Sequence, residues 1–340
     1  MKVLFICSGN ATFNTLSPFI KVQAESLESE GVEVNFFYIK GKGVRNYLKN
    51  VPLLKKEIKT NHYDILHAHY ALCGWVAVLT WTKLPIVLSL MGSDVFGDIN
   101  EKGKRAFKSN LFVLLTRLVQ PFVDVVIVKS SGMRAKITKK RHVYEIPNGI
   151  RMDQFRPLNY DARLKLGLDP NKQYVLFLAN PDDPNKNIQL VQKAVKHLHR
   201  EDLEFINIYK VSHETIVDYL NAVDVFTLCS YSEGSPNVVK EAMSCNCPMV
   251  VTPAGDAPWV IGNTPGCYVG SYDAKGFSEK LSQALNFASI HGRTKGRARI
   301  YELGLDGKHV AQQLESIYLD VTTPKNKEEM ARQQEPISMS

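Results

Sequence analysis

Short apolar runs alternate with amphipathic segments along most of this 340-residue chain. In the first half, five apolar runs have the length and composition of buried strands: 2–7, 32–39, 63–70, 85–92 and 123–130. The segment between the first two runs predicts a helix, because Pro18 lies in its first turn and Gly31 ends it. Strands that alternate with helices predict a parallel sheet with helices on both faces, in a Rossmann-like arrangement.

The second half repeats this pattern. Four apolar runs predict strands, at 174–180, 203–210, 224–230 and 248–253. Four amphipathic segments predict helices, at 187–200, 213–223, 235–245 and 307–321. We therefore expect two Rossmann-like α/β domains, at 1–160 and 161–322, with the last helix able to pack back on the first domain. The polar tail 323–340 is expected to be disordered.

One stretch, 70–91, is apolar enough to suggest a membrane span. Lys83 and Pro85 interrupt it and its second half is rich in β-branched residues, so a short buried helix and a buried strand explain it better. The six cysteines lie mostly inside apolar runs and form no CxxC pair, so we expect reduced core residues. The first residues do not resemble a signal peptide, and these features favour a cytoplasmic protein.

The formal charge of +8 is unevenly distributed along the chain. Residues 1–168 hold 25 Lys and Arg against 13 Asp and Glu, a net +12, and the remainder holds 17 against 21, a net −4. The first half is therefore expected to meet an anionic partner, either nucleic acid or an anionic membrane surface. No nucleic-acid-binding module accompanies the charge, which favours the membrane. The segment 40–59 mixes basic with apolar residues, as such a surface or a solvated helix face would.

The loop 230–237 is the most informative of the loops that follow predicted strands. In open parallel sheets, ligands bind outside the carboxyl ends of the strands, so these loops are where a site is expected. This loop has the sequence SYSEGSPN and leads directly into a helix, with Pro236 expected in the first helical turn. Unpaired backbone N–H groups at a helix start bind anions, and a diphosphate fits there.

Two glutamates, Glu233 and Glu241, belong to this segment. The first lies in the turn, where its carboxylate can accept hydrogen bonds from sugar hydroxyls. The second lies two turns into the helix, where it can bind both hydroxyls of a ribose. Taken singly, each is better interpreted as a solvated acid. Beside an anion site, the two together indicate a bound sugar nucleotide.

This arrangement resembles the donor site of retaining GT-B-fold glycosyltransferases of family 4 (glycosyl transferases group 1). The resemblance is carried by EGSPNVVKEAM at 233–243, with seven residues between its glutamates, and by PMVVTPAGDAPWVI at 248–261. Weaker similarity extends to 146–157, 176–187 and 222–230. The resemblance implies two Rossmann-like domains that face a cleft. It also implies sugar transfer from a nucleotide diphosphate donor, by family habit a UDP-sugar, with retained anomeric configuration and no metal cofactor.

The resemblance also assigns roles to residues. Glu233 would hold the donor hexose, Glu241 the ribose, and Lys186 would neutralise the diphosphate, as a lysine ammonium does well. The backbone of five residues would surround the distal phosphate and sugar: Gly234, Ser235, Pro236, Asn237 and Val238. Lys210 and Val211 would lie near the base. In the first domain, Gly9 would let its loop approach the donor phosphate, where a side chain would collide.

Two positions depart from the family pattern. Asn180, at a donor-binding position, stands where the family commonly has an arginine, so one positive charge is missing, and Arg151 or another cation could replace it. Met91 stands where the family often has a histidine that contacts the donor sugar, and His69 is the neighbouring candidate for that catalytic contact. His67, on the same strand face, is better explained as a buried, hydrogen-bonded residue than as half of a metal site or an acid–base pair.

We therefore expect a metal-independent glycosyltransferase of bacterial surface polysaccharide biosynthesis (capsule, exopolysaccharide or lipopolysaccharide), with a saccharide or lipid-linked saccharide as acceptor. The pair Asp182 and Asp183 lies between two prolines, which is typical of a capped turn. The sequence contains no dinucleotide-binding, Walker or nucleophile-elbow motif. The alternatives are a sugar-nucleotide epimerase, a phosphorylase on the same fold, a non-catalytic nucleotide-sugar-binding subunit, and a nucleic-acid binder supported only by the pI near 9.0.

Overall fold

The structure is a computed structural model that describes residues 1–10, 17–100 and 104–323 of the chain. The chain forms two compact units. The first comprises Met1–Phe96, Lys108–Gly149 and Gly307–Ser340, and the second comprises Gly97–Phe107 and Ile150–Asp306. The tail for which the sequence predicts disorder lies, from residue 324 onward, outside the described residues.

The boundary between the units lies earlier in the chain than the expected boundary between residues 160 and 161. The chain joins the second unit at Ile150, because Ile150, Met152 and Phe155 are buried in the core of that unit. The chain then returns to the first unit at Gly307, where its last helix begins.

The first unit contains a six-stranded parallel sheet with the strand order β2-β1-β3-β4-β5-β6. Its strands are β1 (Lys2–Ser8), β2 (Glu33–Ile39), β3 (Ile65–His69), β4 (Ile86–Ser89), β5 (Val125–Val128) and β6 (Val143–Glu145). The first five were predicted from their apolar runs. The apolar pattern did not predict β6, because its three residues lie among charged side chains and form no apolar run.

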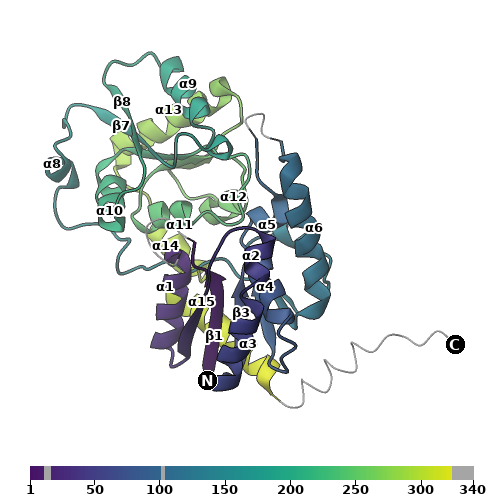
Figure 1. The fold of residues 1–340 in the computed structure, drawn as a ribbon. Helices are drawn as coiled ribbons and strands as arrows, with labels where there is room; N and C mark the ends of the chain where they lie inside the picture. Colours follow the sequence, from purple (N-terminus) through teal and green to yellow (C-terminus); the bar gives the residue numbers. More distant parts are fainter. Residues whose placement is uncertain (11–16, 101–103, 324–340) are drawn as a thin grey trace. The chain divides into compact units, whose positions relative to one another are not determined.

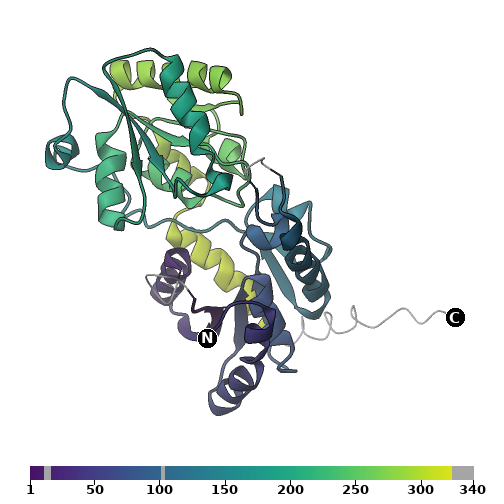
Figure 2. The same cartoon turned by 45° about the horizontal axis from the view of Figure 1, so that its top comes forward.

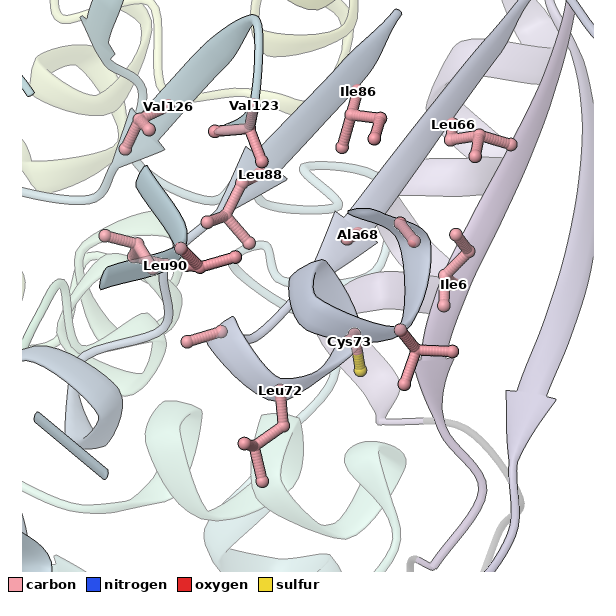
Figure 3. Packing of buried hydrophobic residues seen from close by; sticks show 14 of the residues in the cluster. Ile6, Leu66, Ala68, Leu72, Cys73, Ile86, Leu88, Leu90, Val123 and Val126 are labelled. Carbon is pink, nitrogen blue, oxygen red and sulfur yellow. The ribbon is translucent and has the colours of Figure 1, made fainter. Parts of the chain in front are cut away.

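Helices cover both faces of this sheet (Figure 1). One face packs on α2 (Val44–Leu48), α3 (Val51–Thr60), α4 (Ala71–Val78) and α6 (Asn110–Val119), and the other on α1 (Pro18–Ser29) and α15 (Gly307–Thr322). Figure 3 shows the first of these cores, to which the strands contribute Leu66 and Leu88 and α4 contributes Leu72 and Cys73. Successive strand residues point to opposite faces, so every residue of the central strands β3, β4 and β5 is buried.

The carboxyl-terminal helix α15, yellow in Figure 2, supplies one side of this unit's core. Leu314, Ile317 and Tyr318 of α15 are buried against Phe5 and its neighbours in the sheet. The Tyr318 hydroxyl hydrogen-bonds Nδ1 of His67, whose Nε2 lies 2.8 Å from the hydroxyl of Ser89. The prediction that His67 is a buried, hydrogen-bonded residue is thus confirmed.

The second unit contains a five-stranded parallel sheet with the order β11-β10-β9-β7-β8. Its strands are β7 (Gln173–Leu178), β8 (Leu203–Ile208), β9 (Val225–Leu228), β10 (Met249–Val251) and β11 (Cys267–Val269). The helices α9 (Ile188–His197) and α13 (Ala274–His291) lie side by side on one face (Figure 1). The other face packs on α10 (His213–Ala222), α11 (Asn237–Ser244), α12 (Ala257–Ile261) and α14 (Gly296–Glu302).

In both sheets the first strand of the unit lies between the second and the third. Connections therefore leave that strand and its neighbour in opposite directions, which opens a crevice at the carboxyl ends of the two strands. In the second unit this switch point lies between β7 and β9, and in the first unit between β1 and β3. The fold thus selects two pairs of loops as candidate ligand sites.

Two further predictions from composition can be compared with the structure. All six cysteines are buried with free thiols, as expected for reduced core residues. The apolar stretch 70–91 forms α4 and β4, as predicted. Among the described residues, no helix has both the length and the apolar character needed to cross a bilayer.

We predict that Tyr318→Phe lowers the free energy of unfolding by about 1–3 kcal/mol, because a buried nitrogen of His67 loses its partner. The measurement is urea denaturation followed by circular dichroism. Tyr144→Phe is the matched control, because Tyr144 packs on the same core while only partly buried. An equal loss of stability in both variants would show that the hydrogen bond to His67 contributes nothing specific.

Candidate functional site

An ion pair joins the two loops at the switch point of the second unit. Lys186 follows β7 and Glu233 follows β9, and the Lys186 ammonium lies 2.6 Å from Oε1 of Glu233. The two side chains keep 29% and 15% of their surface exposed. The pair is therefore shielded from most of the solvent but still accessible to a ligand at the sheet edge.

Asn185 holds the same two loops together through its side chain and its backbone. Its side-chain amide donates to the carbonyl of Ser232 at 2.8 Å, and its Oδ1 accepts from the Ser232 N–H at 3.0 Å. Its carbonyl accepts from the N–H of Tyr231 at 2.9 Å. These three bonds fix the position of the Glu233 turn relative to the β7 loop.

The acidic pair in the β7 loop behaves as a capped turn. The Asp183 side chain accepts a hydrogen bond from the N–H of Asn185 at 3.0 Å, which is the capping role expected from the sequence. Within the described ranges, no cluster of three or more His, Cys, Asp or Glu side chains could hold a metal ion.

The helix after Glu233 begins two residues later than the predicted start at residue 235. Pro236 is the residue before α11, with φ −69° and ψ 112°, and the helix begins at Asn237. The first N–H groups of any α-helix have no acceptor within the helix. In α11 they follow Gly234 and Ser235 directly, so the turn that carries Glu233 also presents these amides.

Gly255, in the loop after β10, packs directly against the backbone of this turn. Its φ is +61°, and a Cβ placed on it would lie 2.7 Å from the carbonyl oxygen of Gly234 and 2.9 Å from that of Glu233. Real Cβ atoms do not approach oxygen so closely, so the turn could not keep its position beside any other residue. The absence of a side chain at Gly255 thus sets where Glu233 lies.

A buried lysine lies beneath the turn. Lys240 of α11 is fully buried, and its ammonium donates to Oγ of Ser235 at 3.0 Å. Burial lowers the pKa of Lys240 to about 8, while the nearby carboxylates of Asp256 and Glu241 raise it. Lys240 is therefore largely protonated at neutral pH and adds positive charge behind the start of α11. Arg151, which the sequence suggested as a possible compensating cation, lies 3.6 Å from Asp153 and keeps 40% of its side chain exposed, so its part in donor binding stays a prediction.

Glu241 lies on α11 next to Lys240 and is half-buried. Burial raises the pKa of its carboxyl from 4.5 to about 7, and the charge of Lys240 partly offsets that effect. Near neutral pH the group therefore exists in both forms, and a neutral carboxyl can donate as well as accept a hydrogen bond.

A cavity of about 360 Å³ lies between the loops after β7 and β8. Its polar lining includes Asn180, Lys186 and Lys210, and its other walls include Tyr209, Val211 and Ile216. Its volume lies at the lower end of the range for small-molecule sites. Asn180, Lys186, Lys210 and Val211, named from the sequence, are thus brought together, and the β8 loop contributes Tyr209, which the sequence analysis had not named.

Gly9 and His69 lie in the first unit, at its own switch point. A Cβ on Gly9 would lie 3.1 Å from Cβ of Tyr38, so the loop is tightly packed there. His69 keeps only 2% of its surface exposed, and neither ring nitrogen has a hydrogen-bond partner among the described residues. Burial and the nearby charge of Lys129 lower its pKa, so its ring is neutral. Its role in substrate contact stays a prediction.

Models of two glycosyltransferase families match the two halves of the chain. Residues 21–154 match "Glycosyltransferase Family 4", and residues 206–286 match "Glycosyl transferases group 1". The chain is a nucleotide-sugar-dependent glycosyltransferase with the GT-B fold. The second match includes Lys210, Val211, Glu233 and Glu241, and the first includes His69.

This glycosyltransferase is similar in sequence to proteins that act on bacterial glycoconjugates. It is 26% identical over 244 residues to the teichuronic acid biosynthesis glycosyltransferase TuaC of Bacillus subtilis, covering 65% of the chain and 61% of that relative. It is also 26% identical over 304 residues to the N,N'-diacetylbacillosaminyl-diphospho-undecaprenol alpha-1,3-N-acetylgalactosaminyltransferase of Campylobacter jejuni, covering 80% of the chain and 81% of that relative.

Solved structures share the fold of the glycosyltransferase. Sucrose-phosphate synthase from Thermosynechococcus elongatus superposes with a TM-score of 0.78 at 18% identity, covering 94% of this chain and 98% of that one. Anabaena HepE, in complex with UDP, superposes with a TM-score of 0.70 at 15% identity, covering 93% of this chain and 99% of that one. At such low identity these similarities establish the fold alone.

We predict that stability falls as pH rises through the range in which Glu241 loses its proton. Its folded pKa of about 7 exceeds its usual 4.5, so the folded state binds more protons than the unfolded state between these values. The free energy of unfolding of the unchanged chain, minus that of the Glu241→Gln variant, should therefore decline by roughly 1–3 kcal/mol between pH 4.5 and about pH 7. Urea denaturation across that range measures it, with the exposed Glu214→Gln as control. A constant difference would contradict the raised pKa.

We also predict that Gly255→Ala raises the KM for the nucleotide sugar at least about tenfold, because displacing the Glu233 turn misplaces its carboxylate. Gly167→Ala is the matched control, since Gly167 has a similar φ of +66° but nothing within 4 Å of a new Cβ. That variant should lose about 1 kcal/mol of stability with unchanged kinetics. Equal kinetic effects in the two variants would exclude a specific role for Gly255.

Proposed function

We propose that this enzyme transfers a sugar from a nucleotide diphosphate donor, a UDP-sugar, to a saccharide or lipid-linked saccharide with retained anomeric configuration. The reaction would belong to the synthesis of a bacterial surface polysaccharide at the inner face of the cell membrane. The observation that carries the proposal is the Lys186–Glu233 pair at the β7/β9 switch point, beside the start of α11. The names of the TuaC and Campylobacter relatives support the bacterial glycoconjugate context.

Three groups would bind the diphosphate. The Lys186 ammonium has three donor protons, so it can keep its bond to Glu233 and also bind a phosphate oxygen. The backbone N–H groups at the start of α11 would add donors and the positive end of the helix dipole. Ser235 accepts from Lys240, which has only protons to offer, so the Ser235 hydroxyl proton is available for a third bond to phosphate. This cationic set needs no metal ion.

The remaining parts of the donor would occupy the groups on either side of the diphosphate. Glu233 would accept hydrogen bonds from the hydroxyls of the sugar, as a carboxylate held in place by Lys186 and the Asn185 bonds. The base would enter the cavity lined by Tyr209, Lys210 and Val211. Glu241 would bind the ribose, and its raised pKa lets it act as donor or acceptor there.

The chemical step requires stabilisation of charge and no protein nucleophile. The bond between the anomeric carbon and the phosphate oxygen breaks, and negative charge develops on the departing diphosphate. The acceptor oxygen forms its bond to the anomeric carbon on the same face, and the departing phosphate oxygen takes the acceptor proton. Lys186, the α11 amides and Ser235 would stabilise that developing charge. His69 and Gly9 of the first unit are proposed as further donor contacts.

A screen of thermal stability against UDP and a panel of UDP-sugars tests the donor, because a true ligand stabilises the fold by mass action. Incubation with the stabilising UDP-sugar alone then separates the reactions. An epimerase converts the sugar without an acceptor, and a phosphorylase requires inorganic phosphate. A binding subunit releases no UDP even with acceptor-containing membranes.

We predict that Glu233→Ala lowers the rate of sugar transfer at least about a hundredfold while the shift caused by UDP persists, because the sugar is the only part of the donor that the carboxylate would contact. UDP release in the presence of acceptor-containing membranes measures the rate. Glu214→Ala, an exposed acid of the same unit, is the control and should keep full activity. Full activity in the Glu233→Ala variant would refute the proposed donor site.

A further inference from the structure

Helix α6 of the first unit exposes a row of large apolar side chains. Leu111, Leu114 and Leu118 keep 57%, 51% and 50% of their surface exposed, although leucine is usually buried. Residues at this spacing lie on one side of a helix, so the three form a continuous stripe. Phe122, just beyond the helix, is 60% exposed.

The opposite side of α6 accounts for how the helix is held. Val113, Thr116 and Val119 are buried on the unit, and the indole N–H of Trp75 on α4 donates to the carbonyl of Leu115 at 3.0 Å. The helix is therefore fixed by its inner side, and its outer stripe is not needed for folding. Figure 1 shows α6 at the outside of the first unit, beside α4.

A basic segment lies directly against the end of this helix. The backbone N–H groups of Thr138 and Lys139 both donate to Oε1 of Gln120, at 2.8 and 3.0 Å, and the Lys139 ammonium donates to the carbonyl of Val123. Lys136, Lys140 and Arg141 of this segment are exposed, as is Arg117 on α6 itself. Residues 110–142 contain seven Lys and Arg and a single acid, Asp124.

We propose that the stripe Leu111–Leu114–Leu118, with Phe122 and the adjoining basic segment 136–141, is a docking surface for an anionic lipid bilayer. Apolar side chains that enter the acyl boundary beside cations that meet anionic headgroups are the pattern of interfacial helices. A second copy of the chain fits less well, because a two-fold contact through the stripe would bring the same basic segments together. This docking surface would bring the enzyme to the membrane that holds the proposed lipid-linked acceptor. Its biological purpose therefore rests on the proposed function, but the binding of lipid does not.

The membrane surface expected from the sequence, 40–59, has a different character. Tyr47 and Leu54 of this segment are buried in the core, and Val51 and Ile58 pack against it. Its outer side presents mainly lysines, with Leu48 and Leu53 as its exposed leucines. The apolar residues that suggested a membrane surface at 40–59 are therefore largely core residues, whereas the apolar stripe of α6 points outward.

The test is sedimentation of the full chain with vesicles of phosphatidylcholine alone or mixed with phosphatidylglycerol. We expect binding to the mixed vesicles that weakens in high salt. The triple variant Leu111→Ser/Leu114→Ser/Leu118→Ser should bind at least about tenfold more weakly. Lys136→Glu/Lys140→Glu/Arg141→Glu should bind more weakly by about fivefold or more for each residue changed.

Leu114→Ser and Leu319→Ser form a matched pair of controls. Their leucines are 51% and 52% exposed in the same unit, but Leu319 lies on α15, which covers the other face of the sheet. Only the α6 variant should lose vesicle binding, and this pair decides the matter if the triple variant does not fold. No binding by the unchanged chain, or equal binding by both variants, would overturn the proposal.

Two further measurements separate the remaining explanations. In sedimentation velocity without lipid, the unchanged chain should show no self-association through the stripe. Self-association that the α6 variants abolish would instead identify the stripe as a contact between two copies. The shift in thermal stability caused by UDP should be the same in every variant. If UDP caused no shift in the thermal stability of the unchanged chain, the proposed function would be contradicted. That result would not bear on vesicle binding, which needs neither donor nor acceptor.

Discussion

The attraction between the Lys186 ammonium and the Glu233 carboxylate is the interaction on which the candidate site depends. The two residues follow the neighbouring strands β7 and β9, whose pairing ends at Phe177 and Thr227. Beyond that point the connections leave the sheet in opposite directions. The ion pair and the Asn185 bonds to Ser232 span that gap. Under the proposed function, a diphosphate that enters the crevice would meet an ammonium already in position, and the carboxylate would bind the attached sugar.

Buried charge beneath the turn adds a second constraint. Isolated charges are costly to bury, so Lys240 is tolerable only because Ser235 accepts from it and the carboxylates of Asp256 and Glu241 lie near it. The arrangement orients the Ser235 hydroxyl and keeps positive charge behind the helix start. In the proposed donor site, this charge would stand in for the arginine that the family commonly has at the position of Asn180.

The helices on the two faces of the first unit's sheet have different surroundings. On the α15 side, apolar helix residues and the His67–Tyr318 bond complete the core. On the α4 side, the core is complete beneath α6, yet leucines continue on its outer surface. Exposed apolar groups of this size beside a basic segment are unnecessary for stability and are best explained by a partner. A sugar acceptor carried on a lipid would supply the reason for such a partner.

The sequence by itself determined the two α/β units, nine of the eleven strands in the described part of the chain, and the loops that hold Glu233, Lys186 and Lys210, because apolar periodicity and turn chemistry are local properties. It did not determine β6 or β11, because each has only three residues and forms by pairing with a neighbouring strand. It also did not determine the unit boundary at Ile150, which follows from burial in the core of the second unit. Tertiary structure alone decided that Lys186 meets Glu233, that Lys240 and Gly255 support the turn, and that His69 is buried. These are contacts between residues far apart in the chain, or on the hidden side of a helix, where no local pattern records the partner.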